Sequence, residues 1–168
     1  MPPESRSFGR SPFAAIVFLP GLLAAPAALA AVSCSVSAVG PAFGVYSPAG
    51  AAAALANGSI TATCTLLSGG TTTVNLVSSY STGASGTYSA RTMLSGAQSL
   101  SYNLYFDAAY TQIRGNGTGG SQQGGATFTL TPSAPTGSTT SVIYGRIPAL
   151  QDVGAGAYTD TIIVTVTY

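Results

Sequence analysis

Apolar and polar residues alternate along most of the chain from residue 32 onward, and this period of two predicts β-strands rather than helices. The segments that carry the pattern are residues 32–39, 59–67, 72–77, 99–106, 126–130, 140–147 and 160–168. Clusters of Gly, Pro, Asn and Ser separate them, as expected of turns. Many short strands joined by turns predict an all-β sandwich or barrel.

Three segments interrupt the alternation and are predicted to be loops. Residues 49–56 are rich in alanine, but Pro48 and Gly50 disfavour a helix there. Residues 131–138 contain two prolines and are predicted to be a connection. Residues 115–125 match the G-x-G-x-x-G fingerprint of dinucleotide sites, yet no helical pattern follows and no acidic residue lies about twenty positions on. A loop is therefore the better interpretation of this glycine-rich segment.

The beginning of the chain has the pattern of an export signal. Arg6 and Arg10 form a short basic segment, an apolar run follows, and Ala28-Leu29-Ala30 has the small residues of a cleavage site. A membrane anchor is the rival interpretation, because residues 12–32 carry no charge and are long enough to span a bilayer. The prolines in this run and the cleavage site favour removal, so we expect residues 1–30 to be a signal peptide.

Residues 31–168 are then expected to form one exported domain of nearly zero net charge. This part of the chain contains no Lys, Glu or His. Its charged residues are Arg91, Arg114 and Arg146 and Asp107, Asp152 and Asp160. Nothing in this balance predicts electrostatic attraction to nucleic acid or to anionic lipid. The mature chain is therefore expected to bind no nucleic acid. No second apolar run as long as the first follows residue 32, so the mature chain is also expected to have no integral membrane span.

Cys34 and Cys64 are the two cysteines of the chain, and in an exported protein such a pair predicts a disulfide. A reactive thiol would need a nearby His or Lys to lower its pKa. Residues 31–168 offer neither, which favours the disulfide.

The inventory of side chains argues against catalysis. Ser-His-Asp, Cys-His and Ser-Lys machinery need an imidazole or an amine, and zinc sites need Cys and His at ligand spacing. The three aspartates remain, but Asp107 follows a strand and Asp160 opens one, where a turn-favouring side chain is ordinary. We expect that the chain is not an enzyme and that it holds no metal ion and no cofactor.

Tyr80, Tyr88 and Tyr110 lie near predicted turns and are candidates for an exposed contact surface. Tyrosines on alternating strands are more often half-buried sheet residues, so the structural interpretation is the stronger one.

The C-terminal segment is predicted to be a strong, apolar strand. Its inward face would carry Ile162, Val164, Val166 and Tyr168. If such a strand lay at the edge of a sheet, its free backbone would invite strand addition from another chain.

Several motifs of the chain resemble the spore coat protein U domain, which is found in subunits of archaic chaperone–usher pili. They are C-S-V-S-A at 34–38, F-G-V-Y at 43–46, T-C-T-L-L-S-G-G at 63–70, Y-S-A-R-T-M at 88–93, L-S-Y-N-L-Y-F-D at 100–107, Y-G-R-I-P at 144–148 and G-A-Y-T-D-T-I-I-V-T-V-T-Y at 156–168. The resemblance implies an incomplete immunoglobulin-like β-sandwich of the pilin type that lacks its final strand. Residues 31–168 would be this domain.

The resemblance also implies partners and roles. A periplasmic chaperone, an outer-membrane usher and other fibre subunits would be the partners, at the cell surface after export. Ile162, Val164, Val166 and Tyr168 would line the groove that receives the chaperone or donor strand, and Tyr158 would be a structural corner tyrosine.

Cleavage after Ala30 would leave few residues ahead of Cys34, too few for a donor strand. This predicts a tip or minor adhesive subunit that accepts a strand and offers none. A self-contained secreted binding module and a spore or cyst coat component remain the alternatives.

Overall fold

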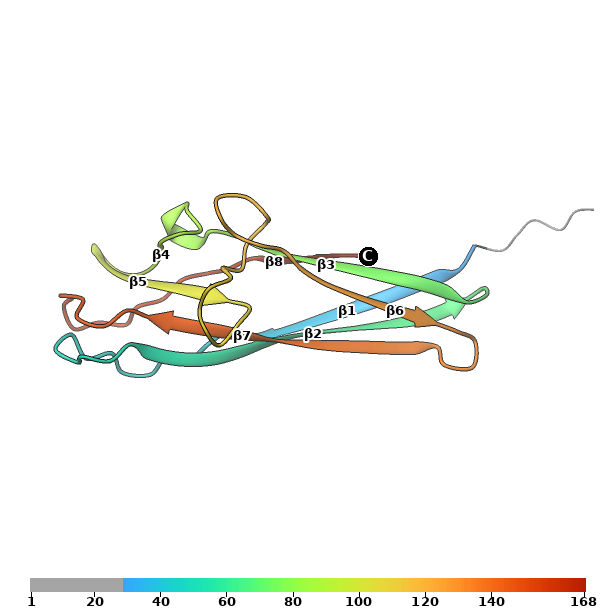
Figure 1. Cartoon of the computed structure of the whole chain (residues 1–168), viewed down its shortest axis with the longest axis horizontal. Coiled ribbons are helices and arrows are strands. Elements are labelled where there is room, and N and C mark those ends of the chain that lie inside the picture. The colour runs from blue at the N-terminus through green and yellow to red at the C-terminus, as the bar shows by residue number, and fades with distance from the viewer. Residues whose placement is uncertain (1–28) are drawn as a thin grey trace, which may run out of the picture.

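The structure, a computed structural model, describes residues 29–168 and is built from two antiparallel sheets packed face to face (Figure 1). The five-stranded sheet has the order β1 (Ala31–Val39), β2 (Ala54–Ser68), β7 (Thr136–Ile147), β5 (Gln98–Tyr105) and β4 (Arg91–Ser95). The three-stranded sheet has the order β6 (Gly124–Leu130), β3 (Thr72–Tyr80) and β8 (Val164–Thr167). A 3-10 turn, η1 (Gly83–Ser85), follows β3. The predicted all-β sandwich is confirmed.

The long pairing of β2 with β7 shows how the sequence pattern produces the sandwich. Ile60, Ala62 and Cys64 of β2 point inward and are buried. The alternate residues face outward, where Thr61 and Thr140 hydrogen-bond through their hydroxyls at 2.8 Å. A strand with one apolar and one polar face is stable only when the apolar face packs against a second layer.

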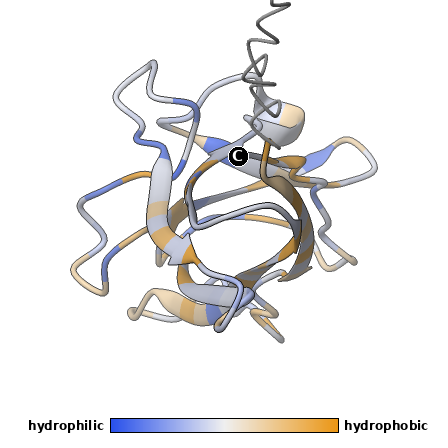
Figure 2. Cartoon of the chain, turned by 90° about the vertical axis from the view of Figure 1, so that its right-hand side faces the viewer, coloured by the Kyte–Doolittle hydropathy of each residue, from blue (hydrophilic) through white to orange (hydrophobic). Residues whose placement is uncertain are grey.

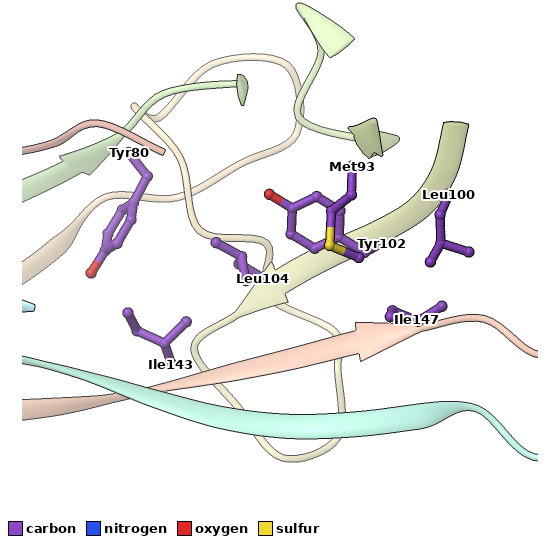
Figure 3. Close-up of a cluster of buried hydrophobic side chains, with 7 residues drawn as sticks. All are labelled: Tyr80, Met93, Leu100, Tyr102, Leu104, Ile143 and Ile147. Atoms are coloured by element: carbon purple, nitrogen blue, oxygen red, sulfur yellow. The ribbon is translucent and has the colours of Figure 1, made fainter. Parts of the chain in front are cut away.

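Two clusters of buried apolar side chains fill the space between the sheets. The first contains Tyr80, Met93, Leu100, Tyr102, Leu104, Ile143 and Ile147 (Figure 3). The second contains Ala62, Cys64, Leu66, Val74, Leu76 and Leu130. Seen end-on, the curled sheets wrap around this interior (Figure 2). Both clusters extend to half-buried residues of the C-terminal segment.

The predicted disulfide is confirmed. Cys34 of β1 and Cys64 of β2 are register partners and are joined covalently. Cys64 is fully buried in the second cluster. The bond therefore fastens the outermost strand of the five-stranded sheet to its neighbour.

The largest differences from the predicted boundaries are in three strands. β2 begins at Ala54, inside the segment expected to be a loop, because its pairing with β7 continues to Ile147. β7 begins at Thr136, directly after the turn at residues 131–134. β8 spans only Val164–Thr167, and the extended residues 160–163 reach β3 by other contacts that are described below. β4 was not predicted.

The predicted signal peptide falls, except for its last two residues, outside the described residues. Within residues 29–168, no helix is long and apolar enough to cross a membrane.

Candidate functional site

Two sheet edges remain open on the same side of the sandwich. β1 ends the five-stranded sheet and pairs only with β2, while β8 ends the three-stranded sheet and pairs only with β3, within the described residues. In a β-strand, the N–H and C=O groups of alternate residues point to opposite edges. Each of these two strands therefore presents one row of backbone donors and acceptors that has no partner strand.

A cleft separates the two edges at the end of β1. Its volume is about 300 Å³, and its walls come from both strands. Ala38 and Val39 line one wall, and Ile162 and Val164 line the other. The buried ring of Tyr80 also contributes to the lining. The cleft is thus an apolar gap into the first cluster, bordered by two unpaired strand edges.

The interior remains underfilled further along β8. A second cavity of about 270 Å³ lies between the sheets. Val166 of β8 lines it together with Ile60, Ala62 and Leu76, and residues 122–126 at the β6 edge and Thr139 and Ser141 of β7 also belong to the lining. Well-packed interiors contain few voids larger than a water molecule. Both cavities touch β8, but the second also reaches the β6 edge on the other side of the three-stranded sheet. The cleft at Ile162 and Val164 is therefore the one that lies beside the free edges of β1 and β8.

The four predicted groove residues are not equivalent in the structure. Ile162, Val164 and Val166 are half-buried and pack against the two clusters. Tyr168 lies beyond the end of β8 and is 61% exposed. On the facing strand, Val36 is 46% exposed. The structure thus brings Ile162 and Val164 to the cleft, places Val166 at the second cavity and leaves Tyr168 exposed beyond the strand.

The two edges also have opposite directions. β1 and β8 run in opposite directions along the long axis of the molecule (Figure 1). A strand placed between them must be parallel to one and antiparallel to the other. Both arrangements form regular hydrogen-bond ladders, so the backbone geometry of the edges excludes neither direction.

Asp160 fixes the start of the C-terminal segment. Its Oδ1 accepts hydrogen bonds from the backbone N–H of Ala84 at 3.0 Å and of Thr161 at 2.8 Å. Its Oδ2 accepts the hydroxyl proton of Tyr102 at 2.6 Å. Burial, and next the hydrogen bond to Asp160, raise the pKa of Tyr102 well above its ordinary value. The carboxylate therefore ties the approach to β8 to η1 and to β5.

The predicted contact tyrosines fall into two groups. Tyr80 is only 1% exposed, so its expected exposure was wrong. It lies at the end of β3 beneath Arg114, whose Nη1 donates to the Tyr80 hydroxyl at 2.6 Å. Tyr88 and Tyr110 are partly exposed, and the ring of Tyr110 packs edge-on against Tyr105. With Tyr80 buried, the three tyrosines do not form one shared contact surface.

Tyr158 packs against the first cluster, and its hydroxyl donates to the carbonyl of Gly154 at 2.8 Å. This bond closes the turn that precedes the C-terminal segment. The role of Tyr158 as a corner residue agrees with this contact and stays a prediction.

Two buried arginines near the cleft were missed by the sequence analysis. Arg91 and Arg114 are both 0% exposed. Arg114 donates to Tyr105 O at 3.0 Å and to Ser141 Oγ at 2.7 Å, and it lies 3.9 Å from the ring centre of Phe106. Burial lowers the pKa of both guanidinium groups. An arginine in a polar-looking segment gives no sequence signal that it is buried.

Comparison with known proteins agrees with this architecture. None of the curated proteins matches the chain. Among solved structures, a chain in the crystal structure of the CsuC–CsuE chaperone–tip adhesion subunit pre-assembly complex from archaic chaperone-usher Csu pili of Acinetobacter baumannii has a similar fold. The TM-score is 0.50 and the identity 19%, over 82% of this chain and 40% of that chain. This chain thus spans well under half of the length of its structural neighbour.

The Spore Coat Protein U domain matches residues 21–165, which is most of the sequence. The match covers both cysteines and both edges of the cleft. The resemblance noted in the sequence is confirmed, and the chain belongs to the Spore Coat Protein U domain family.

Proposed function

We propose that the chain is a structural subunit of an exported surface fibre, in which a strand from another polypeptide completes the sandwich. The observation that carries this proposal is the apolar cleft between the free edges of β1 and β8. A donor strand placed there hydrogen-bonds to both edges, and its inward side chains fill the cleft. Main-chain bonds then supply affinity, and the side-chain pockets supply selectivity.

The open state explains why such a subunit needs partners during assembly. Free edges and uncovered apolar surface favour aggregation. A chaperone that covers the cleft, and later a neighbouring subunit that replaces it, protect the same surface in turn. The structural neighbour belongs to a pre-assembly complex between a chaperone and a tip adhesion subunit of a pilus. We therefore propose a periplasmic chaperone, an outer-membrane usher and other fibre subunits as the partners of this chain.

Within the fibre we assign the chain to the tip or to a minor adhesive position. The predicted cleavage after Ala30 supports this, because β1 already begins at Ala31 and is used in the sheet. N-terminal sequencing of the exported protein tests the assignment. A mature chain that starts well before Ala31 would provide a donor segment and contradict it.

A donor peptide tests the proposed function. The probe is a synthetic peptide in which valine and threonine alternate over the length of β1, with lysines at both ends for solubility. The exported chain is titrated with it, and the melting temperature is followed. We expect a concentration-dependent rise, because a ligand that binds only the folded state stabilises that state.

The control peptide has serine in place of every valine and is otherwise identical. It keeps the backbone and the charges but cannot fill the cleft with apolar side chains, so it should leave the melting temperature nearly unchanged. Equal effects of the two peptides, or no effect of either on a protein that refolds reversibly alone, would favour the self-contained binding module instead.

A further inference from the structure

The hydrogen-bond ladder between β3 and β8 continues for one residue pair beyond the two strands, but there a side-chain oxygen replaces one of the backbone acceptors. In the register of these strands, Ser81 stands opposite Ile163. The N–H of Ser81 donates to the carbonyl of Ile163 at 2.9 Å, as an antiparallel ladder requires. The return bond would run from the Ile163 N–H to the Ser81 carbonyl. Instead, the Ile163 N–H donates to the side-chain Oγ of Ser81 at 2.9 Å.

The carbonyl of Ser81 is unavailable because Arg91 occupies it. Nε and Nη2 of Arg91 donate to this oxygen at 3.3 and 2.9 Å. The same guanidinium donates to Asn103 Oδ1 and to Arg114 O, both at 2.7 Å. A planar group fixed by four bonds to neutral oxygens has little freedom. Arg91 therefore ends the backbone ladder at Ser81, and the Ser81 hydroxyl replaces the missing acceptor.

We propose that Arg91 and Ser81 are positioning residues for the acceptor cleft, an inference that rests on the proposed function. Because the N–H and C=O of Ile163 both point to Ser81, those of Ile162 and Val164 point to the open edge. The pair holds Ile162 in extended conformation against the cleft. The edge that a donor strand can use is thereby lengthened beyond the start of β8.

The exposure of Ile163 makes this role separable from general stability. Its side chain is 66% exposed, so water can reach the nearby backbone if the serine hydroxyl is removed. Ser81→Ala should therefore loosen residues 160–163 locally while the core stays folded. Ser81→Thr keeps the hydroxyl and should restore the bond. Ser79→Ala is the matched control, because Ser79 lies two residues earlier on β3 and the structure shows no hydrogen bond of its hydroxyl.

Amide hydrogen exchange of the exported chain tests the positioning itself. We expect the Ile163 amide to exchange about fivefold faster in Ser81→Ala, the effect of losing one ordinary hydrogen bond. Thr165 should exchange at an unchanged rate. Ser81→Thr and Ser79→Ala should behave like the unmodified chain. An Ile163 amide that exchanges equally fast in all four proteins would overturn the proposal.

The Val/Thr donor peptide then tests the link to assembly. Its dissociation from Ser81→Ala should be several-fold faster than from the unmodified chain, with little change of the peptide-free melting temperature. Equal dissociation rates with faster exchange at Ile163 would also overturn the proposal, because the loosened segment would not matter to the donor. Failure of the peptide to bind the unmodified chain would instead contradict the proposed function.

Discussion

The hydroxyl of Tyr102 donates a 2.6 Å hydrogen bond to the Asp160 carboxylate and joins the middle of β5 to the beginning of the C-terminal segment. Tyr102 is 6% exposed and belongs to the first buried cluster. The bond therefore couples the core of the sandwich to one wall of the cleft.

Tyr102→Phe should lower the free energy of unfolding by about 2 kcal/mol at pH 8, because it removes a hydrogen bond to a charged group. Burial raises the pKa of Tyr102 in the folded state above its ordinary value of about 10. The unfolded chain then loses this proton above about pH 10 while the folded chain keeps it. The contribution of Tyr102 to the free energy of unfolding is thus fully present below about pH 10 and falls by about 1.4 kcal/mol per pH unit above it.

Urea unfolding of both proteins from about pH 8 to about pH 11 checks this prediction. The difference between them should shrink above about pH 10. A difference that stays constant up to about pH 11 would mean that Tyr102 titrates normally.

Gly83→Ala should disturb the hydrogen bonds of Asp160 that hold the start of the C-terminal segment. Gly83 has φ +69°, and a Cβ at this position would collide with the Asp160 carboxylate. Gly86→Ala is the matched control, because Gly86 has φ +72° but open space around its Cα. Left-handed backbone costs an alanine about 1–2 kcal/mol at either site. Gly83→Ala must also displace the Asp160 carboxylate. Its free energy of unfolding should therefore be clearly lower than that of Gly86→Ala. Equal losses would show that Asp160 moves freely.

Replacement of both cysteines by alanine should destabilise the exported chain by about 3 to 4 kcal/mol on the chain-entropy model. The disulfide closes a sequence separation of 30 residues and fastens β1 to β2. Urea unfolding of the double variant, beside the oxidised unmodified chain, measures the loss. We also expect faster amide exchange in β1 than in β7. A loss below about 1 kcal/mol would indicate that the hydrogen bonds of β1 suffice.

Arg114→Lys should destabilise the protein although it keeps the charge. The guanidinium donates to Tyr80, Tyr105 and Ser141 and to the carbonyl of Val142. The lysine ammonium is a compact group without the planar set of N–H donors of a guanidinium. Some of the buried acceptors would therefore lose their hydrogen-bond donors. We expect a loss of at least about 2 kcal/mol in urea unfolding. Arg146→Lys, at an exposed position on β7, is the control and should be nearly neutral.

The strands were predictable where the core alone decides the pattern. In β1 and β2, apolar side chains alternate with Ser and Thr, and the structure has strands over both segments. β4 was missed because it begins with Arg91, a charge that the pattern assigns to the surface. Its burial depends on Asn103 and on backbone carbonyls that come from distant parts of the chain. A short window of sequence does not contain that information.

The candidate site was predictable in part for the same reason. The alternation of Ile162, Val164 and Val166 identified the inward face of the last strand from local sequence. That β1 forms the opposite wall depends on the order of strands in two sheets, which no local pattern encodes. Tyr80 was expected at the surface because it ends a strand, but the loop that carries Arg114 covers it.

If a strand is missing between β1 and β8, a donor strand attached covalently to the chain should stabilise the fold. The chain is extended after Tyr168 by an Asn-Gly turn and a strand of alternating valine and threonine, which can fold back along β8. Valines that fill the cleft should raise the melting temperature by at least about 10 °C. The same extension with serine for valine is the control. Equal melting temperatures of the two extended proteins would show that the sandwich needs no further strand between β1 and β8.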